Sequence, residues 1–261
     1  MPDERELTLS GPEGRHAATV RRLRPGERVD ITDGCGVVAE CTVLRCRRDE
    51  IDCAVERRVV YPEPTPRLVV IQALAKGDRG ELAVELMTEV GVDEIVPWSA
   101  ARSIVRWEGE RGARAHARWS ATAREAAKQS RRVFWPQLAC LADTATVSAR
   151  LAAADVAVVL HEEASEPLAV GLRAAGVTSA RPRPAAPAGA QLPAPAGSLE
   201  AGSLEIVLVV GPEGGITGSE REVFGAAGAV PARLGRTVLR TSTAGVVAAA
   251  IVFSHTSRWD R

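Results

Sequence analysis

The chain has 261 residues, 46% of them hydrophobic and 25% charged, which is the composition of a globular protein long enough for two domains with separate cores. Its 33 Lys and Arg residues balance 33 Asp and Glu residues, so the formal net charge is zero and argues against attachment to nucleic acid by bulk electrostatics. The apolar stretches are too often interrupted by charges to span a bilayer, and the polar N-terminus MPDERELTLS is unlike a secretory signal, so we expect a cytoplasmic protein without membrane association.

The first part of the chain predicts a small β-barrel-like domain. Residues 13–24 have the pattern of a short helix, and residues 26–60 alternate apolar and polar side chains over three or four strands. Within them Asp33-Gly34 is a hairpin signal. The three prolines of YPEPTPR, residues 61–67, indicate a stiff linker, so we expect the first domain to cover residues 1–66.

The cysteines do not form a metal-binding pattern. None belongs to a C-x-x-C pair, and no histidine lies among the four in the strand-rich stretch, whose spacing fits buried strand positions. We therefore expect reduced thiols and no metal site. The five cysteines are Cys35, Cys41, Cys46, Cys53 and Cys140.

From residue 67 the pattern changes to buried strands that alternate with helices. Such alternation is typical of a parallel α/β sheet, whose ligands bind at loops beyond the carboxyl ends of the strands. Residues 178–203 are rich in Pro, Ala, Gly and Ser, and we expect a flexible surface insertion there, within a second domain over residues 67–261. The expected strands are 68–76, 93–98, 154–160 and 204–210, and the expected helices are 80–91, 113–132 and one that begins near residue 217.

A glycine-rich loop, GPEGGI at residues 211–216, joins a strand to a helix that Thr217 and Glu220 are placed to cap through T-x-x-E spacing. The loop lacks the Gly-Lys-Ser/Thr of a P-loop and the spacing of a dinucleotide fingerprint. Pro212 has no amide to offer a phosphate, and Glu213 repels anions. These features favour a neutral or cationic adenosine-containing ligand such as S-adenosylmethionine. A plain tight turn before a capped helix is the alternative.

A second loop, LGRTVLR at residues 234–240, precedes a long apolar helix that Thr241, Ser242 or Thr243 is expected to cap. Arg240 lies at the exit of this loop. It is either a surface charge or a group directed at a substrate phosphate or carbonyl.

Clusters of arginine keep RNA binding open despite the neutral net charge. Basic residues recur at roughly helical spacing within the helix 113–132, where they either bind RNA or form an ordinary solvated face. The expected basic face combines Arg124, Lys128, Arg131 and Arg132 with Arg102 and Arg106.

The pair of stretches LVVGPEGGIT and LGRTVLRTSTA resembles the signature of the RsmE family of SPOUT-class RNA methyltransferases, which methylate N3 of one uridine in the decoding region of 16S ribosomal RNA. This pair is fairly specific. The resemblance covers nearly the whole chain, because weaker stretches add to it: RHAATVRRLRPGERVDITDG, AKGDRGELAVELMTEVGVDEIVP, ARSIVR, EAAKQSRR and LHEE.

The resemblance implies an α/β fold, with a SPOUT-type parallel sheet that ends in a C-terminal trefoil knot and a PUA-like, RNA-binding β-barrel before it. It also implies a homodimer, S-adenosylmethionine as cofactor, and 16S ribosomal RNA, within the small ribosomal subunit, as partner. We expect Arg240 to be the catalytic residue, stabilising charge on the uracil or orienting a phosphate. Aliphatic side chains and backbone groups of the knot loops would hold the cofactor: Leu160, His161, Gly211, Glu213, Gly214, Gly215, Ile216, Leu234, Gly235, Leu239 and Ser242. The RNA-binding residues are expected to be Arg21, Arg22, Arg102, Arg124, Lys128, Arg131 and Arg132.

Two positions depart from the family pattern. Ser242 stands where family members usually have the glutamate of R-T-E-T, and Leu86 stands where they often have a lysine, so no role of those residues is carried over. The general base is not identified, with His161 and Glu89 as candidates. Two alternatives stay open: a SPOUT methyltransferase acting on a ribose 2′-hydroxyl, and a non-catalytic RNA-binding protein of the same fold.

Overall fold

The computed structural model of the protein describes residues 5–177 and 204–259, so the insertion expected at 178–203 lies outside the described residues. The chain divides into two compact units. Unit 1 comprises Met1–Glu63 and Arg132–Phe134, and unit 2 comprises Pro64–Arg131 and Trp135–Arg261.

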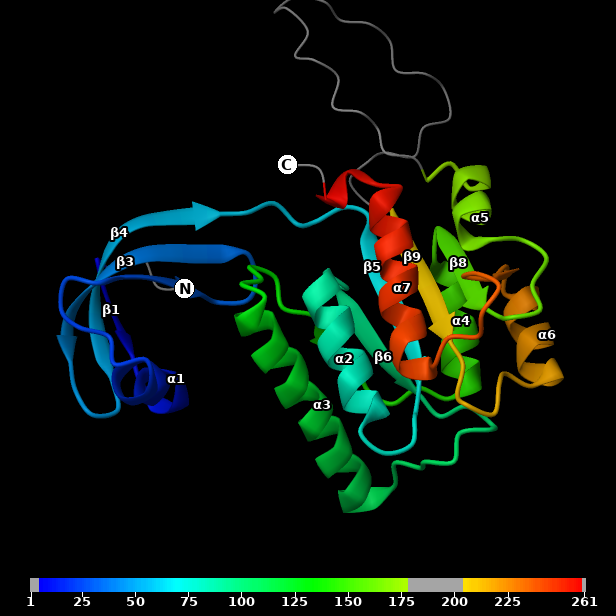
Figure 1. Ribbon diagram of the computed structural model, residues 1–261, viewed down its shortest axis with the longest axis horizontal. Coiled ribbons are helices and arrows are strands. Elements are labelled where there is room, and N and C mark those ends of the chain that lie inside the picture. Colours follow the sequence, from blue (N-terminus) through cyan, green and yellow to red (C-terminus); the bar gives the residue numbers. More distant parts are fainter. Residues whose placement is uncertain (1–4, 178–203, 260–261) are drawn as a thin grey trace, which may run out of the picture. The chain divides into compact units, whose positions relative to one another are not determined.

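Unit 1 is built on a four-stranded antiparallel sheet with the order β1-β4-β3-β2 (Figure 1). The hairpin expected at Asp33-Gly34 joins β2 to β3, and Gly34 adopts the φ of 75° that favours glycine in such a turn. The expected helix is also confirmed, as α1 and the π-helical turn η1 that continues it. The elements of this unit are β1 (Glu6–Leu9), α1 (Gly11–Arg15), η1 (His16–Val20), β2 (Arg28–Thr32), β3 (Val37–Cys46) and β4 (Ile51–Val60).

Three residues from much later in the chain, Arg132–Phe134, complete unit 1. Phe134 forms a β-bridge with Cys35, and the Val133 carbonyl accepts a hydrogen bond from the Gly36 amide at 3.3 Å. A Cβ at Gly36, whose φ is 103°, would lie 2.5 Å from the Phe134 ring. Glycine at this turn therefore lets the returning segment pack against the hairpin.

The helix expected over 113–132 is present as α3 (Gly109–Gln129), but it ends earlier than the sequence predicts. Ser130 is its C-terminal cap, and Arg131 takes a left-handed φ of 55°. The prediction that Arg131 and Arg132 continue a basic face of this helix is wrong, because both follow its last residue and Arg132 belongs to unit 1. Residues that favour a helix continue through the turn at Ser130 and Arg131, so the local sequence does not indicate that α3 ends there.

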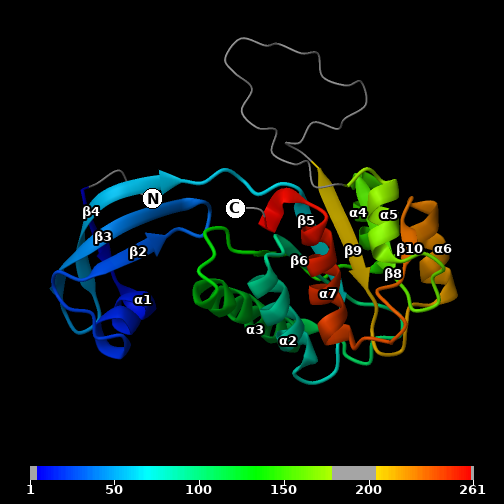
Figure 2. The ribbon, with the colours of Figure 1, turned by 45° about the horizontal axis from the view of Figure 1, so that its top comes forward.

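Unit 2 contains the parallel α/β sheet that the sequence predicts. Its six strands have the order β10-β8-β9-β5-β6-β7 and pair in parallel, and Figure 2 shows β9 and β8 between β5 and the edge strand β10. The runs of aliphatic residues in β5 and β9 are buried on both faces, as central parallel strands require. The strands are β5 (Arg67–Ala73), β6 (Glu94–Trp98), β7 (Gln137–Leu138), β8 (Val156–Leu160), β9 (Glu205–Val210) and β10 (Val230–Ala232).

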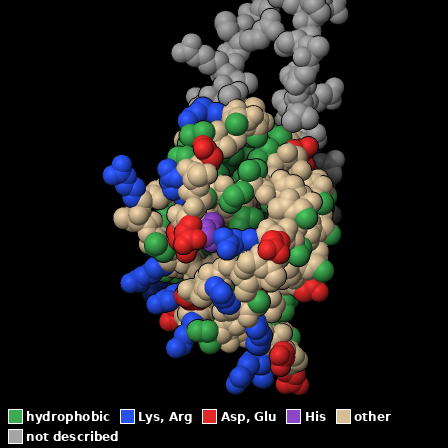
Figure 3. Space-filling model, turned by 90° about the vertical axis from the view of Figure 1, so that its right-hand side faces the viewer, with side chains coloured by type: hydrophobic (Ala, Val, Ile, Leu, Met, Phe, Trp, Pro, Cys, Tyr) green, Lys and Arg blue, Asp and Glu red, His purple; other side chains and the backbone are tan. Residues whose placement is uncertain are grey.

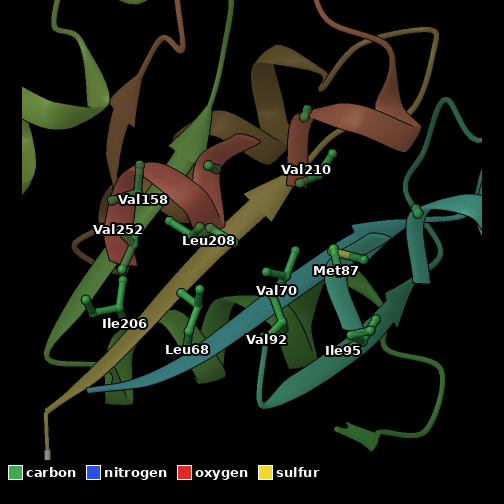
Figure 4. Packing of buried hydrophobic residues seen from close by; sticks show 14 of the residues in the cluster. Leu68, Val70, Met87, Val92, Ile95, Val158, Ile206, Leu208, Val210 and Val252 are labelled. Carbon is green, nitrogen blue, oxygen red and sulfur yellow. The ribbon is translucent and has the colours of Figure 1, made fainter. Parts of the chain in front are cut away.

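Helices cover both faces of this sheet. Side chains of α2, α3, α5 and α7 share one core with alternate residues of the strands, and those of α4 and α6 share the other. Figure 4 shows the first core, where Val70 and Leu208 of the sheet lie among Met87 of α2 and Val252 of α7. Helices α4 and α5 and strand β7 are not predicted from the sequence, because they are short and adjoin alanine-rich or loop segments. Besides α3, the helices are α2 (Arg79–Val90), α4 (Thr144–Ala153), α5 (Leu168–Ala174), α6 (Gly218–Ala226), α7 (Thr241–Ser254) and the 3-10 turn η2 (Ser257–Trp259).

Candidate cofactor site

A cavity of about 300 Å³ lies where the loops that follow β8, β9 and β10 meet. This is the edge of a parallel sheet at which ligands bind, because the strands end there and the loops diverge. Gly214 and Ser242, which were expected to contact a cofactor, do not line the cavity. The other expected residues do line it: Leu160, His161, Gly211, Glu213, Gly215, Ile216, Leu234, Gly235, Leu239 and Arg240.

The glycines of the loop 211–216 each have a separate physical reason. A Cβ at Gly211 would lie 2.7 Å from Cγ1 of Ile216, and a Cβ at Gly214 would lie 3.1 Å from Cβ of Arg102. Gly215 adopts a φ of 74°, and its amide closes a tight turn on the Pro212 carbonyl at 2.9 Å. The loop is therefore compact, and its shape depends on all three glycines.

Glu213 ties the glycine loop to the segment that precedes α2. Its Oε1 accepts hydrogen bonds from the Lys76 amide at 3.2 Å and from Nη1 of Arg79 at 3.3 Å. The carboxylate that the sequence analysis treated as repelling anions is thus already paired with an arginine. Arg79, which the sequence analysis did not select, lines the cavity as well.

The expected capping box at the start of α6 is confirmed. The Thr217 hydroxyl accepts from the Glu220 amide at 3.2 Å, and Oε2 of Glu220 accepts from the Thr217 amide at 2.9 Å. The other oxygen, Oε1, accepts from the Ala101 amide at 2.8 Å and from the Thr144 hydroxyl at 3.4 Å. Burial acts to raise the pKa of the Glu220 carboxyl, but the hydrogen bonds from Ala101 and Thr217 outweigh it and hold the pKa below its ordinary value.

The segment fixed by Glu220 packs against the glycine loop. Nη1 of Arg102 donates to the Gly214 carbonyl at 3.1 Å, which explains why Gly214 faces this segment and not the cavity. Arg106 donates to the carbonyls of Ala100 and Ala101 at 2.9 and 3.1 Å. Both arginines therefore hold backbone in place, whatever else they contact.

The long apolar helix expected near the C-terminus is α7, but the expected cap is wrong. The N-cap is Arg240, and no side chain of the described residues caps the helix. The Thr241 hydroxyl instead donates to the Gly211 carbonyl at 2.8 Å and accepts from Nε2 of Gln72 at 3.0 Å. Ser242 is only 3% exposed and packs inside the protein. The Thr241 hydroxyl thus links the two glycine-containing loops that line the cavity.

Three arginines line the cavity, and they differ in what they contact. Nη1 of Arg233 donates to the carbonyls of Ala164, at 2.8 Å, and Ser165. Arg79 pairs with Glu213. Arg240 is exposed, and its side chain makes no hydrogen bond or ion pair with any described residue, whereas its backbone carbonyl accepts hydrogen bonds from the Thr243 and Ala244 amides. Within the described part of the chain, its guanidinium is therefore the one at this cavity that is available to a ligand.

The two candidate bases are placed differently. His161 lines the cavity, and its Nδ1 accepts a hydrogen bond from the Glu163 amide at 3.2 Å. A neutral ring in this arrangement carries its proton on Nε2, so it presents a donor and not a base. Glu89 is an exposed residue of α2 and does not line the cavity, nor does Leu86.

The expected RNA-binding residues are distributed over both units. Arg21, Arg22 and Arg132 belong to unit 1, and the remaining four belong to unit 2. On α3 the Arg124 guanidinium stacks over the Trp135 ring at 5.2 Å, and Lys128 pairs with Glu125 at 2.6 Å. The side of unit 2 formed by α5 and α6 carries interspersed acidic and basic side chains (Figure 3).

The cysteines of the structure are all free thiols: Cys41 and Cys53 are buried and the other three are exposed. Burial raises the pKa of Cys53 to about 11, which keeps this thiol protonated at neutral pH. No group of His, Cys, Asp or Glu side chains among residues 5–177 and 204–259 is arranged to hold a metal ion. In the same residues no helix has the length and apolar character needed to cross a membrane.

Comparison with known proteins identifies the class. Residues 62–253 match the model of a family described as an RNA methyltransferase domain, and residues 9–56 match the model of an RNA methyltransferase PUA domain. The parallel sheet, the loop-lined cavity and the preceding antiparallel domain are thus those of an RNA methyltransferase.

Named relatives narrow the class further. Ribosomal RNA small subunit methyltransferase E of Mycobacterium bovis is 42% identical over 265 residues, which is 100% of this chain and 91% of the relative. The Bacillus subtilis protein of the same name is 28% identical over 239 residues, or 91% of this chain and 86% of that one. A structure of ribosomal RNA small subunit methyltransferase E from Neisseria gonorrhoeae, bound to S-adenosyl methionine, has a TM-score of 0.73 at 23% identity and covers 97% of this chain and 94% of its own. The chain belongs to the ribosomal RNA small subunit methyltransferase E family, the RsmE family that its loop motifs resemble.

Proposed function

We propose that the protein transfers a methyl group from S-adenosylmethionine to N3 of a uridine in 16S ribosomal RNA. The observation that carries the proposal is the cavity, which is lined both by a glycine loop unsuited to phosphate and by Arg240, whose guanidinium is available to a ligand. The names of the relatives, methyltransferases of small-subunit ribosomal RNA, support it, as does the S-adenosyl methionine in the Neisseria structure.

The residues of the cavity fit S-adenosylmethionine. Leu160, Ile216, Leu234 and Leu239 provide aliphatic surface for the adenine, and the loop backbone provides amides and carbonyls for its polar edge. The volume of about 300 Å³ is at the lower end of the range of small-molecule sites, which is roughly 300 to 1,000 Å³.

Methylation of N3 requires that the imide proton leave and that the resulting anion face the methyl carbon in line. S-adenosylmethionine, when bound, supplies the electrophilic methyl group. Arg240 is the N-cap of α7, so its charge and the positive end of the helix dipole act at the same place, where they stabilise the negative charge that develops on the uracil. His161, with Nδ1 engaged by a backbone amide, serves as a hydrogen-bond donor to a substrate oxygen.

Nucleoside analysis tests the proposal. The protein is incubated with methyl-labelled S-adenosylmethionine and either assembled small subunits or naked 16S ribosomal RNA, both from a strain that lacks the enzyme. We expect labelled 3-methyluridine, with more on the assembled subunit, because a protein with zero net charge needs many specific contacts. Label on a ribose 2′-oxygen contradicts the proposed target atom, and calorimetry without any binding of S-adenosylmethionine contradicts the enzyme itself.

We propose further that unit 1 and the basic residues Arg21, Arg22, Arg102, Arg124, Lys128, Arg131 and Arg132 contact the RNA. The boundary between the RNA-binding domain and the methyltransferase domain is assigned to residue 66, inside the proline-rich linker. The cytoplasm, where ribosomal subunits are found, is the proposed location.

A homodimer is also part of the proposal. The helix α7 is apolar on all sides, which is typical of a helix with no free face, yet Val246, Val247, Ala250 and Ile251 are half-buried. A second copy packed on this helix would cover them, and light scattering should then give twice the mass of the chain. The trefoil knot is proposed on the path of the chain, which runs from β9 to the edge strand β10 and returns as α7 over β5 and β9.

A further inference from the structure

Gln72 is a polar residue where the fold calls for an apolar one. It lies in the central strand β5 between Ile71 and Ala73, and all three residues are fully buried. Burying an amide is unfavourable even when some of its hydrogen bonds are made, and Oε1 of Gln72 has no partner among the described residues. Stability alone therefore does not explain a glutamine here.

The hydrogen bonds of Gln72 lead to the cavity. Its Nε2 donates to Oγ1 of Thr241 at 3.0 Å and to its neighbour's carbonyl, that of Ala73, at 3.2 Å. The Thr241 hydroxyl has one proton, which it donates to the Gly211 carbonyl at 2.8 Å. Because Gln72 occupies a lone pair of that hydroxyl, the bonds run in one direction, from strand β5 through Thr241 to the glycine loop.

The helix that begins at Thr241 holds Gln72 in place by close packing. A Cβ at Gly245, one turn into α7, would lie 2.7 Å from Sδ of Met87 and 3.6 Å from Oε1 of Gln72. The fully buried glutamine side chain therefore lies against the first turns of α7. The glycine loop and the start of α7 are thus both connected by hydrogen bonds to the central strand β5, through Thr241 and Gln72.

We propose that Gln72 is a positioning residue, which acts through Thr241 to fix the distance between the cofactor loop at Gly211 and the helix start that carries Arg240. This role rests on the proposed function. It does not require Gln72 to touch the cofactor or the RNA, and it accounts for an amide in the core of the sheet whose oxygen has no partner among the described residues. These two hydrogen bonds, from Gln72 to Thr241 and from Thr241 to Gly211, would hold the methyl donor and Arg240 at a fixed distance from each other.

The test compares stability with cofactor affinity in the full-length protein. Gln72→Leu keeps the size of the side chain and removes the amide, so we expect its melting temperature to equal or exceed that of the unchanged protein. The dissociation constant for S-adenosylmethionine should rise about tenfold, which is the factor that one lost hydrogen bond implies. The value of kcat should fall by more than about tenfold, because Arg240 is displaced as well. Thr241→Val should raise the dissociation constant and lower kcat in the same way, but it should also lower the melting temperature, because the buried Gln72 amide and the Gly211 carbonyl both lose the hydroxyl. Thr241→Ser, which retains the hydroxyl, should keep the dissociation constant and kcat near those of the unchanged protein.

Thr88→Val is the matched control, because Thr88 is a buried residue of α2 whose hydroxyl donates to the Val84 carbonyl at 2.7 Å and does not line the cavity. It should leave cofactor affinity unchanged. A Gln72→Leu protein with unchanged affinity and turnover overturns the inference, and so does one that loses melting temperature alone, since that defines a structural role. If the unchanged protein binds no S-adenosylmethionine, the proposed function fails first, and the two failures are distinguishable.

Discussion

At the scale of single residues, Arg240 makes the sharpest prediction. Arg240→Ala should reduce turnover about 100-fold or more, as removal of one group that stabilises transition-state charge does, while the dissociation constant for S-adenosylmethionine changes less than about threefold. Arg240→Lys should recover part of the rate, because it retains the charge without the planar guanidinium. Steady-state kinetics and calorimetry measure the two quantities.

The control for this prediction is Arg236→Ala. Arg236 is an exposed residue of the same loop, but it does not line the cavity. It should leave turnover within about twofold, because an exposed charge outside the cavity contributes little. Equal losses of turnover and cofactor affinity in Arg240→Ala would show that Arg240 binds the cofactor and does not act on the reacting base.

Glu220 predicts a pH dependence of stability. Its pKa is held below the ordinary value of 4.5, so the folded state favours the ionised form, and the stabilisation is present above that value and lost as the pH falls through the lower folded pKa. Glu220→Gln turns an amide donor toward the Ala101 or Thr217 amide and should lower the free energy of unfolding by about 2 kcal/mol at neutral pH. Urea denaturation should show this difference shrink as the pH falls below the ordinary pKa of 4.5 and through the lower folded pKa.

Glu222→Gln serves as the comparison, because Glu222 is an exposed residue of the same helix. It should change the free energy of unfolding by less than about 0.5 kcal/mol at either pH. A difference between Glu220→Gln and the unchanged protein that is the same at pH 7 and pH 4 would mean that ionisation of Glu220 does not contribute.

At the scale of elements, replacing glycine by alanine should have opposite effects on stability in the loop that follows β9 and in the helix α6 after it. Gly215 has a φ of 74°, so Gly215→Ala should destabilise the protein by about 1 kcal/mol and weaken cofactor binding, because the loop must open. Gly225 lies inside α6 with nothing within 4 Å of a Cβ, so Gly225→Ala should raise the free energy of unfolding by roughly 0.5 to 1 kcal/mol. Thermal melting of both variants checks the two signs, and a stabilising Gly215→Ala would contradict the account of the loop.

The elements show what could be predicted from the sequence. Strands β5 and β9 are continuous aliphatic runs, and the capping box of Thr217 and Glu220 is a local pattern, so both were identified correctly. Local patterns failed where a distant contact decides the structure. Gln72 and its partner Thr241 are 169 residues apart, and nothing in either neighbourhood indicates the hydrogen bond between them.

The same reason explains the two errors at helix ends. Thr241 carries a side chain that favours capping, but its hydroxyl is taken by Gly211, and α7 begins without a side-chain cap. The sequence predicts a helix up to Arg132 because alanine, lysine and glutamine favour one, whereas the chain leaves α3 at Ser130 and packs Val133 and Phe134 in unit 1. Tertiary contacts overrode local preference in both cases.

At the scale of the whole molecule, the net charge is zero, but among the described residues some arginines are paired with carboxylates and others are not. In unit 1 some are neutralised across the sheet, as Arg57 is by Glu40 at 2.6 Å and Arg28 by Glu56 at 3.5 Å. Arg21 and Arg22 follow the turn η1, and both are exposed. The proposed RNA surface therefore depends on where arginines lack acidic neighbours, and the total charge of the chain does not predict it.

Salt dependence of RNA binding tests this distinction. If Arg21 and Arg22 each contact a phosphate, the double variant Arg21→Gln/Arg22→Gln should bind 16S ribosomal RNA more weakly and reduce the slope of log K against log salt by about 1.4 to 1.8, since each contact releases 0.7 to 0.9 counterions. Arg57→Gln is the matched control, because its charge is already compensated by Glu40, and it should leave the slope unchanged. Filter binding between about 50 and 200 mM salt covers the range in which such contacts change affinity most visibly. A double variant with the slope of the unchanged protein would remove these two arginines from the RNA surface, and a reduced slope in Arg57→Gln would show that its pairing with Glu40 opens when RNA binds.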